Sequence, residues 1–312
     1  MLKGISSLTA IGVTFLRAAA TNSPDTQVFD DPYAEQFLPY PLRRLTHRPR
    51  FHRHFARAVG RRPILQALMS VLVRARYTED QLVQAMNEGV RQYVILGAGW
   101  DSFVVRRPDL VAELKVFELD HPATQNAKRR RLAKRSLCVP ENVTFIPIDF
   151  QRQSIGEELL KNGFDPSLPT FVNWLGVTYY LPIDIVADVF EELADLCEGG
   201  VDVVFDYLDA RYHHNRTAIR SSQWLMRLLR SIGEPLGTAF DAEELACDFN
   251  HMGYIVVEDL VGPSLRHYVP AEELGPFQPR GYIHVAHVHA PPQAAPDRTH
   301  TPPTTSGTAL AT

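Results

Sequence analysis

The chain has 312 residues, 45% of them hydrophobic and 22% charged, so it can bury a sizeable core and is not a disordered or low-complexity protein. Its 32 lysines and arginines face 36 acidic residues, and the net charge of -4 disfavours a dedicated nucleic-acid binder. Three widely separated cysteines predict neither a disulfide framework nor a zinc cluster, and a reducing cytoplasm fits. Since no run of about 18 uncharged apolar residues is present, we expect no membrane span.

Residues 1–90 are expected to form an N-terminal helical cap, because apolar residues recur there at helical spacing. Asp31 followed by Pro32 predicts a helix start, with the aspartate as N-cap and the proline at the first helical position. Thr78 and Gln81 form a capping-box pattern that predicts a second start. Helices therefore precede the first strong strand.

From residue 93 onward, short apolar runs alternate with stretches compatible with helices. Such runs are typical of strands buried on both faces, and the alternation predicts right-handed crossovers in a doubly wound, mostly parallel α/β sheet. Two later runs could close one edge of the sheet, which gives seven strands. The expected strands span residues 93–96, 116–119, 143–148, 170–174, 201–205, 254–258 and 282–288.

A turn that contains glycine follows the first expected strand. Gly97 and Gly99 stand between that strand and an expected helix, where glycines permit positive φ and let a ligand approach the backbone. The dinucleotide fingerprint would place a third glycine where this chain has Ser102. An NAD-dependent dehydrogenase is therefore disfavoured, but it stays among the alternatives.

Acidic residues end the next two expected strands. Asp120 ends the second strand, where a carboxylate can accept hydrogen bonds from both ribose hydroxyls of a nucleoside. Asp149 ends the third, where it could accept from an adenine amino group while Phe150 contacts the base. Each acid could instead cap the helix that follows. Because ligands of open α/β sheets bind at the carboxyl ends of the strands, the three strand ends together predict a nucleoside site.

Seven segments of the chain occur in the order found in a known family. They are LRA (16–18), FDDPY (29–33), RARY (74–77), LGAGWDS (96–102), FELDHP (117–122), DF (149–150) and WLGVTYYL (174–181). Over about residues 5–288, the chain resembles the S-adenosylmethionine-dependent methyltransferases related to leucine carboxyl methyltransferase, many of whose bacterial members have no assigned substrate. The resemblance implies a class I Rossmann-like methyltransferase fold and S-adenosylmethionine as the cofactor.

The resemblance also implies roles for single residues. Arg76 would neutralise the methionine carboxylate of the cofactor, which suits the arginine fork, although a solvated helix residue is the alternative. Arg17 would be a second basic residue that closes the site. Where carboxyl methyltransferases of the family carry a glutamate on the cofactor's amino group, this chain has Leu175, so that contact would fall to a backbone carbonyl or to Asn173. The predicted cofactor-binding residues are Arg17, Arg76, Gly97, Gly99, Asp101, Asp120, Asp149, Phe150 and Trp174.

The domain organisation follows from these assignments. After the cap, residues 91–206 would form the cofactor-binding Rossmann-like core, and residues 253–290 its C-terminal strands. Residues 207–252 are more than one crossover needs, which predicts an inserted lid or substrate cap. Residues 291–312 are rich in proline, threonine and alanine and are expected to be disordered.

Methyl transfer from a sulfonium is an in-line displacement that needs alignment and the exclusion of water. A carboxylate acceptor needs no base, and a carboxylate of a small molecule or peptide terminus is the expected substrate. A phenol or other hydroxyl, helped by a general base, is the first alternative, and a nucleoside-binding module without catalysis is the second. The candidates for acting on the acceptor are Tyr180, Arg211, Tyr212 and His213.

Two further patterns are expected to be structural. The basic run at residues 128–135 predicts a solvated helix face rather than an RNA contact, given the negative net charge. His284, His287 and His289 do not predict a metal site, because only the last two share a face of a strand and no third ligand is indicated.

Overall fold

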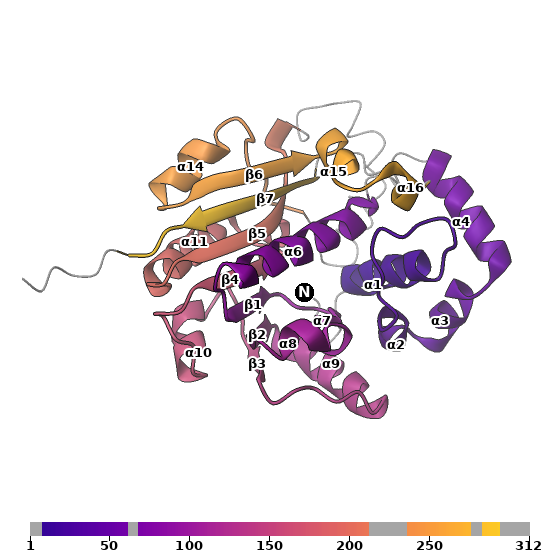
Figure 1. Ribbon diagram of the computed structural model, residues 1–312, viewed down its shortest axis with the longest axis horizontal. Helices are drawn as coiled ribbons and strands as arrows, with labels where there is room; N and C mark the ends of the chain where they lie inside the picture. Colours follow the sequence, from indigo (N-terminus) through magenta and orange to yellow (C-terminus); the bar gives the residue numbers. More distant parts are fainter. Residues whose placement is uncertain (1–7, 62–67, 212–235, 276–282, 294–312) are drawn as a thin grey trace, which may run out of the picture.

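The structure is a computed structural model that describes residues 8–61, 68–211, 236–275 and 283–293. A seven-stranded sheet runs through it in the order β3-β2-β1-β4-β5-β7-β6 (Figure 1). Strands β1 to β5 are parallel, and β7 pairs antiparallel with both β5 and β6. The strands are β1 (Gln92–Leu96), β2 (Lys115–Asp120), β3 (Val143–Pro147), β4 (Thr170–Trp174), β5 (Val201–Leu208), β6 (Ile255–Val261) and β7 (Ile283–Ala290). The predicted doubly wound, mostly parallel α/β sheet of seven strands is confirmed.

Helices pack on both faces of this sheet and bury it in two apolar cores. Tyr93 and Val204 face the core that includes the long helix before β1, whereas Trp174 and Phe205 face the other. This two-sided burial explains why the parallel strands read as continuous apolar runs. The described helices after β1 are α7 (Phe103–Arg106), α8 (Pro108–Val111), α9 (Pro122–Lys134), α10 (Ile155–Lys161), the 3₁₀ turn η1 (Thr178–Tyr180), α11 (Ile183–Leu196), α14 (Leu245–His251), α15 (Pro263–Tyr268) and α16 (Ala271–Leu274).

Helices precede β1. In Figure 1, α1 to α4 lie beyond the end of the strands toward which the β6 arrow points. In the part of the chain that the structure describes, the helices before β1 are α1 (Leu8–Thr21), α2 (Ala34–Phe37), α3 (Tyr40–Thr46), α4 (Pro49–Arg61) and α6 (Ser70–Asn87). Among the described helices, none combines the length and the apolar character that a membrane span requires.

The two helix starts predicted from capping patterns are wrong in position. Thr78 lies inside α6, and its Oγ1 donates to the carbonyl of Arg74 at 2.8 Å instead of capping a helix end. Asp31 accepts a hydrogen bond from the N–H of Ala34 at 3.0 Å, but α2 begins only at Ala34. In both cases a short polar side chain satisfies a nearby backbone group without marking the first turn of a helix.

Strand β5 is longer than its apolar run predicts, so Tyr207 and Leu208 belong to the sheet and not to the predicted lid. They pair with His284 and Ile283 of β7. The charged Asp206 interrupts the run in the sequence, yet its side chain is fully buried within the strand. The rest of the domain division stays a prediction, and the lid residues 212–235 and the tail residues 294–312 lie outside the described part of the chain.

The basic run on α9 is only in part the solvated face that its composition predicts. Arg129 and Arg130 are exposed. Lys128 is 1% exposed, and its Nζ donates to Oε2 of Glu118 on β2 at 2.6 Å. Burial raises the pKa of Glu118, an effect that Lys128 opposes. The prediction was wrong for Lys128 because its partner lies on another element, which the run itself does not reveal.

Candidate cofactor site at the carboxyl edge of the sheet

The ends of β1 and β2 bring the glycine turn and the predicted ribose ligand together. The N–H of Gly97 donates to the carbonyl of Leu119 at 2.8 Å. The N–H of Gly99 donates to Oδ2 of Asp120 at 2.5 Å, and Oδ1 of Asp120 accepts from the N–H of His121 at 2.6 Å. The structure therefore joins Asp120 directly to the glycine turn.

Burial raises the pKa of Asp120, while the N–H groups of Gly99 and His121 and the charge of Lys128 oppose that rise. Each oxygen of the carboxylate accepts one backbone N–H, and a carboxylate has about four lone-pair sites. Asp120 therefore keeps acceptor capacity for two hydroxyl donors.

Both glycines of the turn have positive φ, +68° at Gly97 and +53° at Gly99. A Cβ on Gly97 would stand 2.3 Å from Cγ2 of Val177, which follows β4. A side chain at position 97 is therefore excluded by conformation and by space. This close approach also brings the segment after β4 against the turn after β1.

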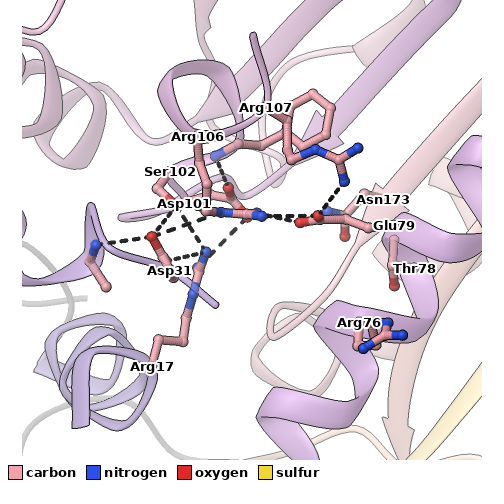
Figure 2. A network of polar contacts seen from close by, with 12 residues as sticks. Arg17, Asp31, Arg76, Thr78, Glu79, Asp101, Ser102, Arg106, Arg107 and Asn173 are labelled. Carbon is pink, nitrogen blue, oxygen red and sulfur yellow. Dashed lines mark hydrogen bonds and ion pairs between the residues drawn. The ribbon is translucent and has the colours of Figure 1, made fainter. Parts of the chain in front are cut away.

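A network of charged side chains links α1 to the same turn (Figure 2). In this network, Arg17 on α1 lies 2.7 Å from Asp31 and donates to Oγ of Ser102 at 3.2 Å. Oγ of Ser102 in turn donates to Asp31 at 2.7 Å, and Arg17 lies 3.8 Å from Asp101. The predicted Arg17 and Asp101 therefore meet beside the glycine turn.

The network continues to α6 through Arg106, which the sequence analysis did not single out (Figure 2). Arg106 forms a buried ion pair with Glu79, and its Nε donates to Ser102 at 3.1 Å. Burial alone would raise the pKa of Asp101, but Arg17, Lys128 and Arg106 outweigh burial and hold the pKa below its usual value. Asp101 is therefore ionised at neutral pH.

Arg76 stands apart from this network in Figure 2. Its Nε donates to Asp80 at 2.9 Å, its Nη1 lies 3.4 Å from Glu273, and its side chain is 39% exposed. The contacts of the described residues give Arg76 no link to the glycine turn. Its assignment to the methionine carboxylate stays a prediction.

Arg74, two residues earlier on α6, is the buried arginine of this motif. It forms an ion pair with the fully buried Asp206 and donates to Oη of Tyr179 at 3.3 Å. Asp206 also accepts from the N–H of Gly176 at 2.6 Å. Arg74 thus ties α6 to β5 and to the segment after β4. The sequence held no signal for this choice, because Arg74 and Arg76 have the same chemistry.

The remaining predicted cofactor residues lie at the ends of β3 and β4. Asp149 accepts from the N–H of Gln151 at 3.2 Å, and Phe150 packs half-buried against the core. Trp174 is fully buried and packs on Phe190, with 5.2 Å between the ring centroids. The indole of Trp174 therefore faces the core, and only its backbone lies at the edge of the sheet.

Asn173 supplies a polar atom that fits the amino group of the expected cofactor. Its Nδ2 donates to Oη of Tyr93 at 3.0 Å. Its Oδ1 is buried and has no hydrogen-bond partner within the described ranges. Since buried polar atoms are nearly always paired, this acceptor at the end of β4 suits an ammonium donor. Leu175, next to it, packs against the core.

Two of the four acceptor candidates can be placed. Nη1 of Arg211 lies 2.9 Å from Glu243, and its Nε donates to Asp209 at 3.1 Å, so two carboxylates balance its charge. Tyr180 belongs to η1 and packs edge-on against Tyr179, with 4.8 Å between the ring centroids. Tyr212 and His213 lie outside the described residues.

Comparison with known proteins identifies the family. Residues 10–194 match the family model for leucine carboxyl methyltransferase. A Bacillus subtilis protein with the provisional name S-adenosyl-L-methionine-dependent methyltransferase YktD is 30% identical over 301 residues, which cover 91% of this chain and 99% of that protein. The chain belongs to the leucine carboxyl methyltransferase family. The family predicted from the sequence is thereby confirmed.

One further relative of this leucine carboxyl methyltransferase family member has a similar provisional name, and two solved structures share its fold. A protein of Mycolicibacterium smegmatis, also provisionally named as an S-adenosyl-L-methionine-dependent methyltransferase, is 29% identical over 232 residues, 72% of this chain and 74% of its own. A crystal structure of a DUF574 family protein from Streptomyces avermitilis shares the fold with a TM-score of 0.57 at 14% identity, covering 93% of this chain and 100% of that one. A provisionally named methyltransferase of Thermobifida fusca has a TM-score of 0.53 at 18% identity, with coverages of 88% and 97%.

The family match ends within α11, so it includes the glycine turn, Asp120 and the helices that cover them. Strands β5, β6 and β7 lie beyond it. The part of this edge of the sheet that lies along these three strands is therefore outside the matched residues.

Proposed function

We propose that this chain is an S-adenosylmethionine-dependent methyltransferase that methylates an oxygen atom of a small molecule or peptide terminus. Family membership supports methyl transfer, and the provisional names of its relatives support the cofactor. The observation that carries the proposal is the bond from the glycine turn to Asp120 at the end of β2, where a ribose would lie.

The described residues fit this cofactor. Asp120 would accept from the ribose hydroxyls, Asp149 and Phe150 would contact adenine, and Oδ1 of Asn173 would accept from the ammonium group. Arg17 pairs with Asp31 beside the turn, but its buried Nε has no partner among the described residues and would face the carboxylate. The bound cofactor supplies a methyl group on a sulfonium, and the residues of the chain hold it in line with the acceptor and exclude water.

The description of the family favours a carboxylate as the acceptor, and that reaction needs no base. A hydroxyl acceptor is the second candidate, because Arg211, the one arginine among the residues predicted to act on the acceptor, already pairs with Asp209 and Glu243 and is less suited to an acidic substrate. We also propose a cytoplasmic location, with which three unpaired cysteines agree.

Calorimetric titration of the purified protein with S-adenosylhomocysteine, with NADH as the control ligand, tests the cofactor. We expect micromolar binding of S-adenosylhomocysteine and none of NADH. Binding of NADH without binding of S-adenosylhomocysteine would contradict the proposal and favour a dehydrogenase. Tight binding of S-adenosylhomocysteine without methyl transfer to any phenol or carboxylic acid would indicate a binding module.

The carboxylate of the cofactor provides a second test, because the geometry favours Arg17 where the sequence-based prediction named Arg76. Arg17→Gln should weaken the binding of S-adenosylhomocysteine about tenfold, or by about 1.4 kcal/mol. The same variant should weaken the binding of 5′-methylthioadenosine far less, because this compound lacks the amino-acid end. Arg76→Gln, whose ion pairs with Asp80 and Glu273 lie apart, should change neither affinity. If Arg76→Gln weakened S-adenosylhomocysteine and Arg17→Gln did not, Arg76 would be the residue that binds the carboxylate of the cofactor.

A further inference from the structure

His284 lies at the start of β7, at the same edge of the sheet as the cofactor residues. Because β7 runs antiparallel to β5, its first residues stand beside the carboxyl end of β5 (Figure 1). His284 pairs with Tyr207 in the register, and their rings stack with 4.6 Å between centroids. It is 3% exposed. A titratable side chain is thus buried beside the end of β5.

One ring nitrogen of His284 is oriented by two neighbours. Nδ1 lies 2.9 Å from Oδ2 of Asp259 on β6 and 3.0 Å from Oη of Tyr207. Oη of Tyr207 itself donates to Asp259 at 2.8 Å, and burial raises the pKa of the phenol so that it keeps its proton. Because the O–H of Tyr207 donates to Asp259, a proton on Nδ1 of His284 also donates to Asp259. That arrangement leaves a lone pair on Nε2.

Nε2 of His284 is buried and has no hydrogen-bond partner among the residues that the structure describes. Oδ2 of Asp209 lies 3.6 Å from this nitrogen. Burial would raise the pKa of Asp209, but Arg211 outweighs it and holds the pKa below its usual value. A proton gained by Nε2 would therefore place an imidazolium between two carboxylates, Asp259 and Asp209.

This group is connected to the cofactor site through adjacent residues. Val177 packs against Gly97 of the glycine turn, and Gly176 donates to Asp206 of β5. Tyr207, the next residue of β5, stacks on His284. Asp206 and Tyr207 point to opposite faces of the sheet, so His284 shares with the cofactor residues the carboxyl end of β5 and lies on the other face from Arg74.

We propose that His284 is the general base of this methyltransferase and that the acceptor is a hydroxyl, such as a phenol. The inference rests on the proposed methyl transfer to oxygen, and of the two acceptors considered there it selects the hydroxyl instead of the carboxylate. As the acceptor oxygen forms its bond to the methyl carbon, the bond from sulfur to that carbon breaks and its electron pair stays on sulfur. The hydroxyl proton passes to Nε2 of His284. Asp259 is a positioning residue that keeps the first proton on Nδ1, and Asp209 stabilises the imidazolium.

The test uses the full chain with S-adenosylmethionine and three probes, namely catechol, 4-hydroxybenzoate and benzoate, with products identified by mass spectrometry. We expect methyl ethers from the two phenols and no methyl ester from benzoate. His284→Gln should lower kcat for catechol about 10²- to 10⁴-fold. For the unaltered protein we expect kcat/KM to fall on the acidic side of its pH profile, and His284→Gln should remove this fall. Binding of S-adenosylhomocysteine should not change.

Two further variants separate a base from a structural residue. His287→Gln is the matched control, because His287 lies on the other face of β7 and contacts Asp202 at 2.8 Å. It should keep kcat within about twofold. Asp259→Asn should lower kcat with KM unchanged, since the amide can donate to Nδ1 and move the ring proton to Nε2.

The outcomes distinguish this inference from the proposed function. Methyl esters alone, no product from the phenols, or a pH profile that His284→Gln leaves intact would overturn the role of His284. None of these results would affect the cofactor assignment while S-adenosylhomocysteine still binds. Failure of the unaltered protein to bind S-adenosylhomocysteine would overturn both.

Discussion

Replacing Arg74 with methionine should lower the free energy of unfolding by about 3 to 5 kcal/mol, the cost of leaving one member of a buried ion pair without its partner. Asp206 is fully buried. Without Arg74, its carboxylate would keep one hydrogen bond among the described residues, from the N–H of Gly176. Burial already raises the pKa of Asp206, and loss of Arg74 would raise it further. Urea unfolding at pH 7 measures the difference.

Arg76→Met is the matched control, on the same helix and with the same change of side chain. Its ion pair with Asp80 is 39% and 42% exposed, so the expected loss is below about 1 kcal/mol. The double variant Arg74→Met/Asp206→Asn should recover part of the stability, because the neutral amide can still accept from Gly176. Equal losses for Arg74→Met and Arg76→Met would contradict the burial of the first pair.

Replacing Asp120 with alanine should weaken the binding of S-adenosylhomocysteine by about 1 to 3 kcal/mol, or about 5- to 150-fold, because both ribose hydroxyls lose their acceptor. Calorimetry with adenosine and 2′,3′-dideoxyadenosine locates the loss. Asp120→Ala should weaken adenosine but leave the dideoxy compound almost unchanged, since the latter has no hydroxyls to lose.

Asp120 also accepts from Gly99 and His121, so its removal could disturb the turn itself. Thermal unfolding of the variant, compared with the exposed Asp109→Ala, separates the two effects. An equal loss for both nucleosides, with an unchanged melting temperature, would contradict the ribose assignment.

The residues that the sequence predicted at the cofactor edge share one property. The role of each depends on its position in a short segment, at the end of a strand or in the turn that follows it. Gly97 is needed where a buried strand turns sharply into a helix, and Asp120 ends the next strand. In a parallel sheet the carboxyl ends of neighbouring strands meet at one edge, so chain order alone brings these residues together. The structure joins them by a hydrogen bond, as that order predicts.

The charged partners required the tertiary structure. Arg74 and Arg76 are equivalent in the sequence, yet packing buries one against Asp206 and leaves the other half-exposed beside Asp80. Lys128 belongs to a basic run, but its ion pair with Glu118 is completely enclosed. Hydrophobic periodicity reports which face of an element is buried. It does not report which charges on two remote elements will meet there.

The sequence by itself determined the doubly wound sheet and the family, and it predicted the edge of the sheet for the cofactor, because buried strands, glycine turns and strand-end acids are properties of short segments. Only the tertiary structure decided the extent of β5 and the grouping of His284 with Tyr207 and Asp259. Those residues come from three strands, 77 and 25 positions apart along the chain. Antiparallel pairing across β5, β7 and β6 brings them into contact, and no local pattern records that pairing.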